Sequence, residues 1–101
     1  IMVKHVILWK LKEELTAEEK ENVKAGIKEG LEGLAGKVPG LVDVKVNING
    51  LPSSTVDVML DTTFTDADAL KAYSTNPLHV AVADGKVRPY TAVRSCLDYE
   101  V

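Results

Sequence analysis

The stretch that decides the fold is residues 41–64, LVDVKVNINGLPSSTVDVMLDTTF. In its first part, alternate positions carry branched apolar residues: Val42, Val44, Val46 and Ile48. In its last part, the same period puts Val56, Val58, Leu60 and Phe64 on one face, and Asp57, Met59 and Asp61 on the other. This alternation is typical of β-strands, and the Gly-Leu-Pro-Ser-Ser segment at 50–54 has the composition of a turn. The stretch therefore predicts an antiparallel hairpin, its second strand running from about 55 to 64.

Two more strands are predicted near the ends of the chain. Residues 2–10 alternate between Val3, His5, Ile7 and Trp9 on one face and Met2, Lys4, Val6, Leu8 and Lys10 on the other. Both sets are apolar in the middle, so we expect both faces to be covered. Residues 92–101 place Val93, Leu97, Tyr99 and Val101 on one face and Arg94, Cys96 and Asp98 on the other.

Helices are predicted between these strands. Thr16 followed by Glu19 forms a capping-box pattern that opens a helix over residues 17–35, with Gly36 as its stop signal. Thr65 and Asp66 can cap a second helix that reaches Ser74. Asn76-Pro77 is typical of the start of a third helix, which we expect Gly85 to close.

The order of elements is β-α-β-β-α-(α)-β, which predicts a single α+β domain over residues 1–101 with a ferredoxin-like fold. In this fold the helices cover one face of a four-stranded antiparallel sheet. We expect the other face to carry Val6, Leu8, Val42, Val44 and Val46, or the residues that alternate with them, together with Val93, Leu97 and Tyr99. Because an apolar face of that size is unfavourable in water, we expect two copies to pack sheet against sheet as a homodimer.

Composition excludes several classes of protein. The chain has 101 residues, a net charge of -3 and one cysteine, so it has no internal disulfide. Its mild acidity argues against a nucleic-acid partner, and no apolar stretch approaches the ~20 residues of a membrane span. The first residues do not have the pattern of a signal peptide, so we expect a cytoplasmic protein with no membrane partner.

Three glycines of the first predicted helix form a bare stripe beside its apolar one: Gly26, Gly30 and Gly33. Each costs ~0.8–1 kcal/mol relative to alanine inside a helix. The stripe indicates either close packing against the sheet or empty space in which a ligand can lie.

Three motifs together resemble the stress-responsive dimeric α/β-barrel (Dabb) family. They are the opening Val3-Lys4-His5-Val6-Ile7-Leu8-Trp9-Lys10, the later Tyr73-x3-Pro77-Leu78-His79-Val80, and the terminal Asp98-Tyr99. The family includes plant stress proteins, a plant polyketide (olivetolic acid) cyclase and many bacterial members without an assigned activity. The resemblance implies a homodimer in which the two sheets form a barrel.

The resemblance also implies roles for particular residues. His79 matches the catalytic histidine of the cyclase, Asp98 the carboxylate that orients it, and Tyr73 the tyrosine near the substrate carbonyl. His5 and Ile7 match residues that line the pocket. The chain departs from the cyclase at Asp57, where the cyclase has a histidine, and at Ile27, where it has a tyrosine, so we expect a different substrate.

The chemistry of these residues leaves alternatives open. At the start of a helix, His79 is favoured as a neutral base, whereas the charge of an Asp98 carboxylate that accepts a hydrogen bond from the ring would raise the pKa of His79; the pair can also be purely structural. His5 is either a core histidine with a partner or part of the pocket wall, and the same choice holds for Trp9. Met59 and Asp57 are assigned to the pocket, with Asp57 as a polar group.

No metal and no cofactor are expected, because the short spacing of three or four ligands that is typical of zinc sites is missing. Cys96 is interpreted as a small apolar residue, with a thiol facing the pocket as the alternative.

Three functions are compatible with the sequence. The first is a homodimer that binds a small apolar or aromatic ligand between helices and sheet. The second is a cofactor-free, polyketide-cyclase-like enzyme in which His79, Asp98 and Tyr73 catalyse an aldol-type or isomerase step. The third is a stress protein whose role is its stable assembly. A binder requires a cavity, the enzyme requires a cavity and a His79–Asp98 contact, and the third function predicts a filled core.

Overall fold

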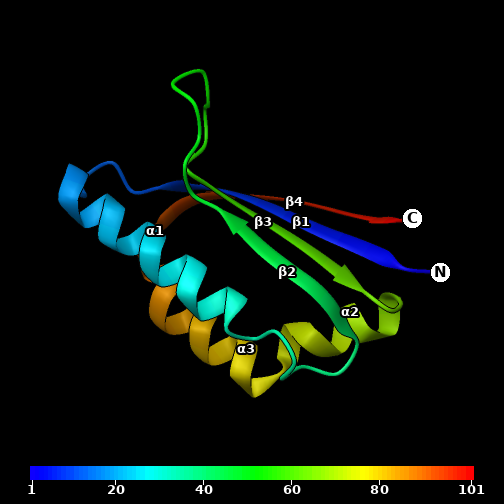
Figure 1. Ribbon diagram of the computed structural model, residues 1–101. Coiled ribbons are helices and arrows are strands. Elements are labelled where there is room, and N and C mark those ends of the chain that lie inside the picture. Colours follow the sequence, from blue (N-terminus) through cyan, green and yellow to red (C-terminus); the bar gives the residue numbers. More distant parts are fainter.

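Four strands form one antiparallel sheet in the order β2 (Leu41–Asn47), β3 (Val58–Phe64), β1 (Val3–Leu11) and β4 (Thr91–Glu100) in the computed structural model, which describes residues 1–101. The helices α1 (Ala17–Glu32), α2 (Ala67–Thr75) and α3 (Pro77–Val82) lie on one face of this sheet (Figure 1). This is the ferredoxin-like α+β fold predicted from the order of elements.

The helix starts follow their predicted caps. Thr16 and Glu19 form the complete capping box of α1, with Glu19 N donating to Thr16 Oγ1 at 3.1 Å and Thr16 N donating to Glu19 Oε1 at 2.9 Å. Asp66 accepts from Ala69 N at the start of α2, and Asn76 accepts from Leu78 N at the start of α3. Local side-chain chemistry therefore sets where each helix begins.

The helix ends follow the prediction less closely. Helix α1 ends at Glu32 and not at residue 35, and Gly36 comes after it with a φ of 77°. Gly85 does not end the third helix, because the chain continues through a π-helical turn, Ala83–Val87, and a 3-10 turn, Arg88–Tyr90. Ala83 and Val87 are both buried, and this packing outweighs the ~1 kcal/mol that a glycine costs in a helix.

The core lies between the sheet and the helices. Strand β1 alternates as predicted, and Val3, His5, Ile7, Trp9 and Leu11 are all buried. They meet Val58, Leu60 and Phe64 of β3 and Ile27 and Leu31 of α1. The fixed alternation of strand side chains thus puts His5 and Trp9 inside the layer that also holds the helices.

A bulge in β2 changes which of its valines face the helices. Leu41 pairs with Phe64, but the next aligned residue is Asp43, opposite Thr63, so the register shifts at Val42. Val46 is therefore buried, and Val44 packs against the core, whereas Val42 is exposed. The sequence left two alternatives for the open face, and neither holds for all strands: Val6 and Leu8 of β1 lie on it, whereas Val44 and Val46 of β2 face the helices, because a residue added at a bulge inverts the alternation.

The open face of the sheet is apolar along β1 and β4. Lys4 pairs with Tyr99, Val6 with Leu97, Leu8 with Ser95 and Lys10 with Val93. Leu97 is 64% exposed, Val93 53% and Tyr99 43%. On the β3 side the face is polar, and Lys4 Nζ lies 2.6 Å from Asp61 Oδ1.

No helix has the length and apolarity needed to cross a membrane.

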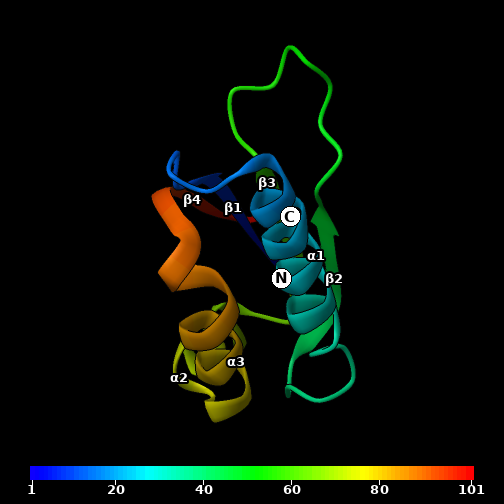
Figure 2. The ribbon, with the colours of Figure 1, turned by 90° about the vertical axis from the view of Figure 1, so that its left-hand side faces the viewer.

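The segment between β2 and β3 extends away from the body of the molecule (Figures 1 and 2). β3 begins at Val58, three residues later than the start predicted near 55. Asp57 anchors the return of the segment, because its carboxylate accepts from Leu11 N at 2.8 Å and its own N donates to Trp9 O at 2.9 Å. Asp57 is therefore a structural residue at the end of β1.

The turn before β2 provides a test of the packing of α2 on the sheet. Gly40 has a φ of 81°, and a Cβ built on it would lie 2.4 Å from Ala69 Cβ. Gly36 has a φ of 77°, and a Cβ there would meet nothing within 4 Å. Gly36→Ala should therefore lower the free energy of unfolding by about 1–2 kcal/mol through backbone strain. Gly40→Ala should lower it by about 1–3 kcal/mol more, because its Cβ also clashes with Ala69. Urea unfolding of both variants measures the difference; equal losses would contradict the close approach of Gly40 to α2.

Candidate functional site

The site begins with two aromatic rings at the junction of α2 and α3. Tyr73, 2% exposed, belongs to α2, and His79 follows on α3. Their ring centroids lie 4.0 Å apart at an interplanar angle of 31°. Tyr73 also lies 5.0 Å from Phe64 and 6.3 Å from His5, both centroid distances. The helix start at Asn76-Pro77 thus brings His79 against the inner layer.

Two polar atoms of this pair are buried without a hydrogen-bond partner. They are the Tyr73 hydroxyl and His79 Nδ1. Burial raises the pKa of Tyr73 to about 12, so its hydroxyl keeps its proton. Burial also lowers the pKa of His79, so its ring is neutral near pH 7. A buried polar atom without a partner costs about 1–3 kcal/mol, and a ligand that hydrogen-bonds to either atom would recover that cost.

Asp98 contacts His5 and not His79. The strands β1 and β4 place these two residues directly opposite each other, and the Asp98 carboxylate hydrogen-bonds to His5 Nδ1. His79 Nδ1 has no side-chain hydrogen-bond partner; the neighbouring polar groups that act on its pKa are the backbones of Ser74 and Tyr73. The predicted hydrogen bond between Asp98 and His79 is therefore not present, because the register of β4 against β1 assigns the carboxylate to the other histidine.

Cys96 is the third member of this strand pair. Its Sγ lies 3.7 Å from His5 Nδ1 and 3.4 Å from Asp98 Oδ1. The residue is exposed and not packed as a small apolar residue. Desolvation and then the neighbouring Asp98 carboxylate raise the pKa of the thiol. One ligand atom from each of His5, Cys96 and Asp98 lies within 4.8 Å of the others, a grouping that residue spacing alone did not predict.

A cavity of about 90 Å³ lies between the sheet and the helices beside His79. Three of the predicted site residues line it: Ile7, Trp9 and His79. The rest of its lining is Leu31, Leu60, Ala83, Val87, Arg88, Thr91 and Arg94. Tyr73 and His5 do not line it: the Tyr73 ring packs against His79, and the His5 ring lies next to Tyr73. Its walls are apolar apart from His79, Thr91 and the two arginines.

The arginines were missed as site residues. Arg88 and Arg94 are the only arginines of the chain, and both line this cavity. Arg88 is paired with Asp84, whereas Arg94 forms no ion pair. The sequence held one signal, since Arg94 alternates with Cys96 and Asp98 on the face of β4 that we assigned to the polar set. What it lacked was the position of the 3-10 turn that carries Arg88.

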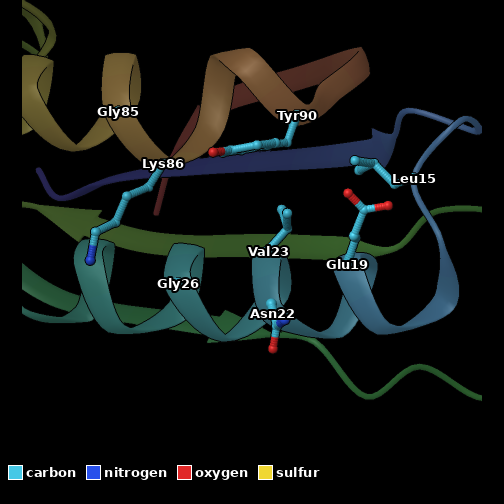
Figure 3. A pocket seen from close by; sticks show the side chains of 8 residues that line it. All are labelled: Leu15, Glu19, Asn22, Val23, Gly26, Gly85, Lys86 and Tyr90. Atoms are coloured by element: carbon cyan, nitrogen blue, oxygen red, sulfur yellow. The ribbon is translucent and has the colours of Figure 1, made fainter.

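A second and wider groove, of about 300 Å³, lies between α1 and the two turns that follow α3. Figure 3 shows Tyr90 facing Val23 of α1 across it. Gly26 and Gly85 border open space, since a Cβ on either would meet no atom within 4 Å. Gly30 differs, because its Cβ would lie 2.8 Å from Val82 Cγ1. Both readings of the glycine stripe therefore apply, and the close packing is against α3 and not against the sheet.

Asp57 and Met59 are not brought to the His79 cavity. Both line a shallow hollow next to the β2–β3 segment, together with Leu8. Met59 pairs with Leu8, which places it on the open face of the sheet. The alternation along β3, which the sequence predicted, separates Met59 from the helices.

Fold and site together define a class: a ferredoxin-like α+β protein with a cavity between sheet and helices and an apolar open sheet face. The chain belongs to the stress responsive A/B barrel domain (Dabb) family, whose model matches residues 3–101. No curated protein matches it significantly.

Solved structures agree with this assignment. A dimeric ferredoxin-like protein of unknown function from Bacteroides fragilis is 35% identical over 99% of this chain and 96% of its own, with a TM-score of 0.93. A dimeric ferredoxin-like protein of unknown function from Jannaschia is 23% identical and covers 100% of both chains, with a TM-score of 0.79. A hydroxynitrile lyase from Passiflora edulis, 16% identical over 97% of this chain and 91% of its own, has a TM-score of 0.72 and shows the fold alone.

The half-buried position of His79 predicts a pH dependence of stability. Its folded pKa lies below the ordinary value of 6.5, so below that pH the unfolded chain binds the proton more readily. Stability should therefore fall as the pH drops from about 6.5 towards the folded pKa of His79. Urea unfolding at about pH 7.5 and about pH 5 should show a larger loss for the wild type than for His79→Gln, and equal losses would contradict a neutral buried imidazole.

Proposed function

We propose that this protein is a homodimer that binds a small, largely apolar ligand with an acidic group in the cavity beside His79. The observation that carries this proposal is the combination of apolar walls, an unpartnered buried His79 Nδ1 and both arginines of the chain in one cavity. From the sequence, a binding protein requires only a cavity, whereas the enzyme requires a cavity and a His79–Asp98 contact. The cavity is present and the contact is not, which favours the binding protein.

The size of the cavity limits the ligand. A water takes up about 30 Å³ in the liquid, so 90 Å³ holds about three waters, and a compound of one ring would also occupy the opening of the cavity. The cavity is smaller than typical ligand pockets of ~300–1,000 Å³, which restricts the ligand to a small compound. Ile7, Trp9 and Leu60 of the sheet provide a flat apolar floor that favours an aromatic or short aliphatic body.

The charge at the cavity favours an anion. The chain carries a net charge of -3, yet two guanidinium groups line this one cavity. Arg88 is partly neutralised by Asp84, whereas Arg94 has no ion pair; its neighbouring polar side chain is the Cys96 thiol, and its guanidinium can therefore bind a carboxylate. Arginine presents donors in a fork that matches a carboxylate. We therefore infer a small aromatic or aliphatic carboxylic acid as the class of ligand.

A homodimer is supported by the open face and by the solved relatives. Val6, Leu8, Leu97 and Val93 form an apolar band that the helices do not cover. The Bacteroides and Jannaschia relatives are dimeric. Packing of two open faces would remove this band from water, at roughly 25 cal/mol per Å² of apolar surface.

An acid–base enzyme is the second candidate, and the unpartnered His79 Nδ1 favours it. A neutral imidazole can take a proton, whereas Tyr73 keeps its hydroxyl proton but does not line the cavity, so the lining does not support the role near a substrate carbonyl that the resemblance implies for Tyr73. The roles differ from those expected from the sequence, because Asp98 is engaged by His5 and does not orient His79. This candidate requires chemical conversion of the bound compound that is lost in His79→Gln.

Ligand binding is testable through Trp9, the only tryptophan of the chain. Benzoate should change Trp9 fluorescence, and benzyl alcohol, which has the same ring without the charge, should bind more weakly. Arg94→Gln should weaken benzoate binding by roughly 10–150-fold, because a hydrogen bond to a charged group contributes about 1.5–3 kcal/mol, and should leave benzyl alcohol binding unchanged.

The matched control is Lys86→Gln, which removes a positive charge from the neighbouring groove and not from the cavity. It should leave benzoate binding unchanged. If neither benzoate nor benzyl alcohol changes Trp9 fluorescence, the binding function is refuted. If the two compounds bind equally well, the anionic ligand class is refuted.

The dimer is testable by light scattering after size exclusion. The wild type should have about twice the 10.9 kDa mass of the chain. Leu97→Glu, which puts a charge in the apolar band formed by β1 and β4, should produce monomers, whereas Leu78→Glu, at an exposed apolar residue of α3, should remain dimeric. A monomeric wild type would contradict this assembly.

A further inference from the structure

We propose that His5, Cys96 and Asp98 form a binding site for a zinc-type dication, held by one nitrogen, one sulfur and one oxygen ligand. The site lies on β1 and β4, and none of these three residues lines the cavity to which we assign the ligand. The proposal therefore stands independently of the proposed function.

The ligand atoms already have nearly the spacing that tetrahedral zinc requires. Zn–S bonds of about 2.3 Å and Zn–N or Zn–O bonds of about 2.0–2.1 Å place pairs of ligand atoms roughly 3.3–3.6 Å apart. Cys96 Sγ lies 3.7 Å from His5 Nδ1 and 3.4 Å from Asp98 Oδ1. His5 and Asp98 are closer, because they share a hydrogen bond that a metal ion would replace.

The sheet holds these ligands on a stiff frame. His5 pairs with Asp98, and Ile7 with Cys96, so the three side chains project from the same face of adjacent strands. His5 is 7% exposed and packed near the rings of Phe64 and Tyr73. Its carbonyl oxygen also accepts from Thr62 Oγ1 at 2.6 Å. One ligand is thus fixed by the core, and the two exposed ones need only small side-chain movements.

The face of the sheet also matters for access. Cys96 and Asp98 lie on the helix side of β4, beyond the helices, and remain exposed. A second copy packed on the open face would not cover them. Three protein ligands with an exposed side leave a fourth position for water, which is the arrangement of zinc sites that keep an open coordination position.

The donor set selects the metal. A thiolate, an imidazole and a carboxylate suit Zn²⁺ and related transition metals, whereas Mg²⁺ and Ca²⁺ prefer oxygen ligands alone. The thiolate is the ligand that favours Zn²⁺ over Mg²⁺ and Ca²⁺. Cys96 is the only cysteine of the chain, so it alone can provide this ligand.

The test is a metal titration of the full-length protein after removal of metals by a chelator. Zn²⁺ is titrated against a chromophoric competitor, and Co²⁺ is then used as a spectroscopic probe. We expect one Zn²⁺ per chain and a thiolate-to-cobalt charge-transfer absorption. Cys96→Ser should abolish that absorption, and Cys96→Ser and Asp98→Asn should each weaken Zn²⁺ binding by at least about tenfold, because even residues that only support zinc ligands contribute about 10–100-fold.

Glu100→Gln is the matched control, since Glu100 is an exposed carboxylate on the same face of β4 and pairs with Val3. It should bind Zn²⁺ like the wild type. Both test residues are exposed, so their variants should fold, and circular dichroism checks this. Absence of stoichiometric binding, or binding that survives both Cys96→Ser and Asp98→Asn, would overturn the proposal. Neither result depends on how benzoate behaves.

Discussion

The alternation of side chains along β1 is the constraint on which the rest of the structure depends. This strand lies inside the sheet, between β3 and β4, and apolar side chains project from both of its faces. The odd-numbered residues His5, Ile7 and Trp9 enter the layer beneath the helices, where they build the core, the cavity and the pair with Asp98. The even-numbered Val6 and Leu8 form the apolar open face with β4. A shift of one residue would exchange core and surface along the whole strand.

Around this strand, the protein keeps polar groups inside an apolar layer at a cost to its stability. The Tyr73 hydroxyl and His79 Nδ1 are buried without partners, and each such atom is unfavourable by about 1–3 kcal/mol. Cores usually satisfy or remove groups of this kind. His79 lines a cavity together with two arginines, and this arrangement supports the ligand site that we propose there.

The family explains how one fold accommodates different sites. Solved structures with the same fold include proteins of unknown function and a hydroxynitrile lyase. A shared fold does not transfer an activity, so the function of this chain depends on its own side chains. Arg94 and Cys96 are two such side chains on the helix side of β4: Arg94 lines the cavity, and Cys96 lies beside His5.

The sequence by itself determined the elements, their order and the faces of β1, β3 and β4. These follow from local rules: side-chain period, helix caps at Thr16, Asp66 and Asn76, and turn composition. The residues that resemble the family also identified three residues of the cavity, Ile7, Trp9 and His79. Such signals need only neighbouring residues, which is why the sequence was sufficient for them.

Only the tertiary structure decided which of these residues meet. The bulge at Val42 turned two valines of β2 towards the helices, and the burial of Ala83 and Val87 carried the helical backbone past Gly85. The register of β4 against β1 gave Asp98 to His5 and placed Cys96 beside both, although 91 residues separate Cys96 from His5. Strand register and helix packing minimise the energy of the whole sheet and core at once, so no local pattern in the chain specifies these contacts.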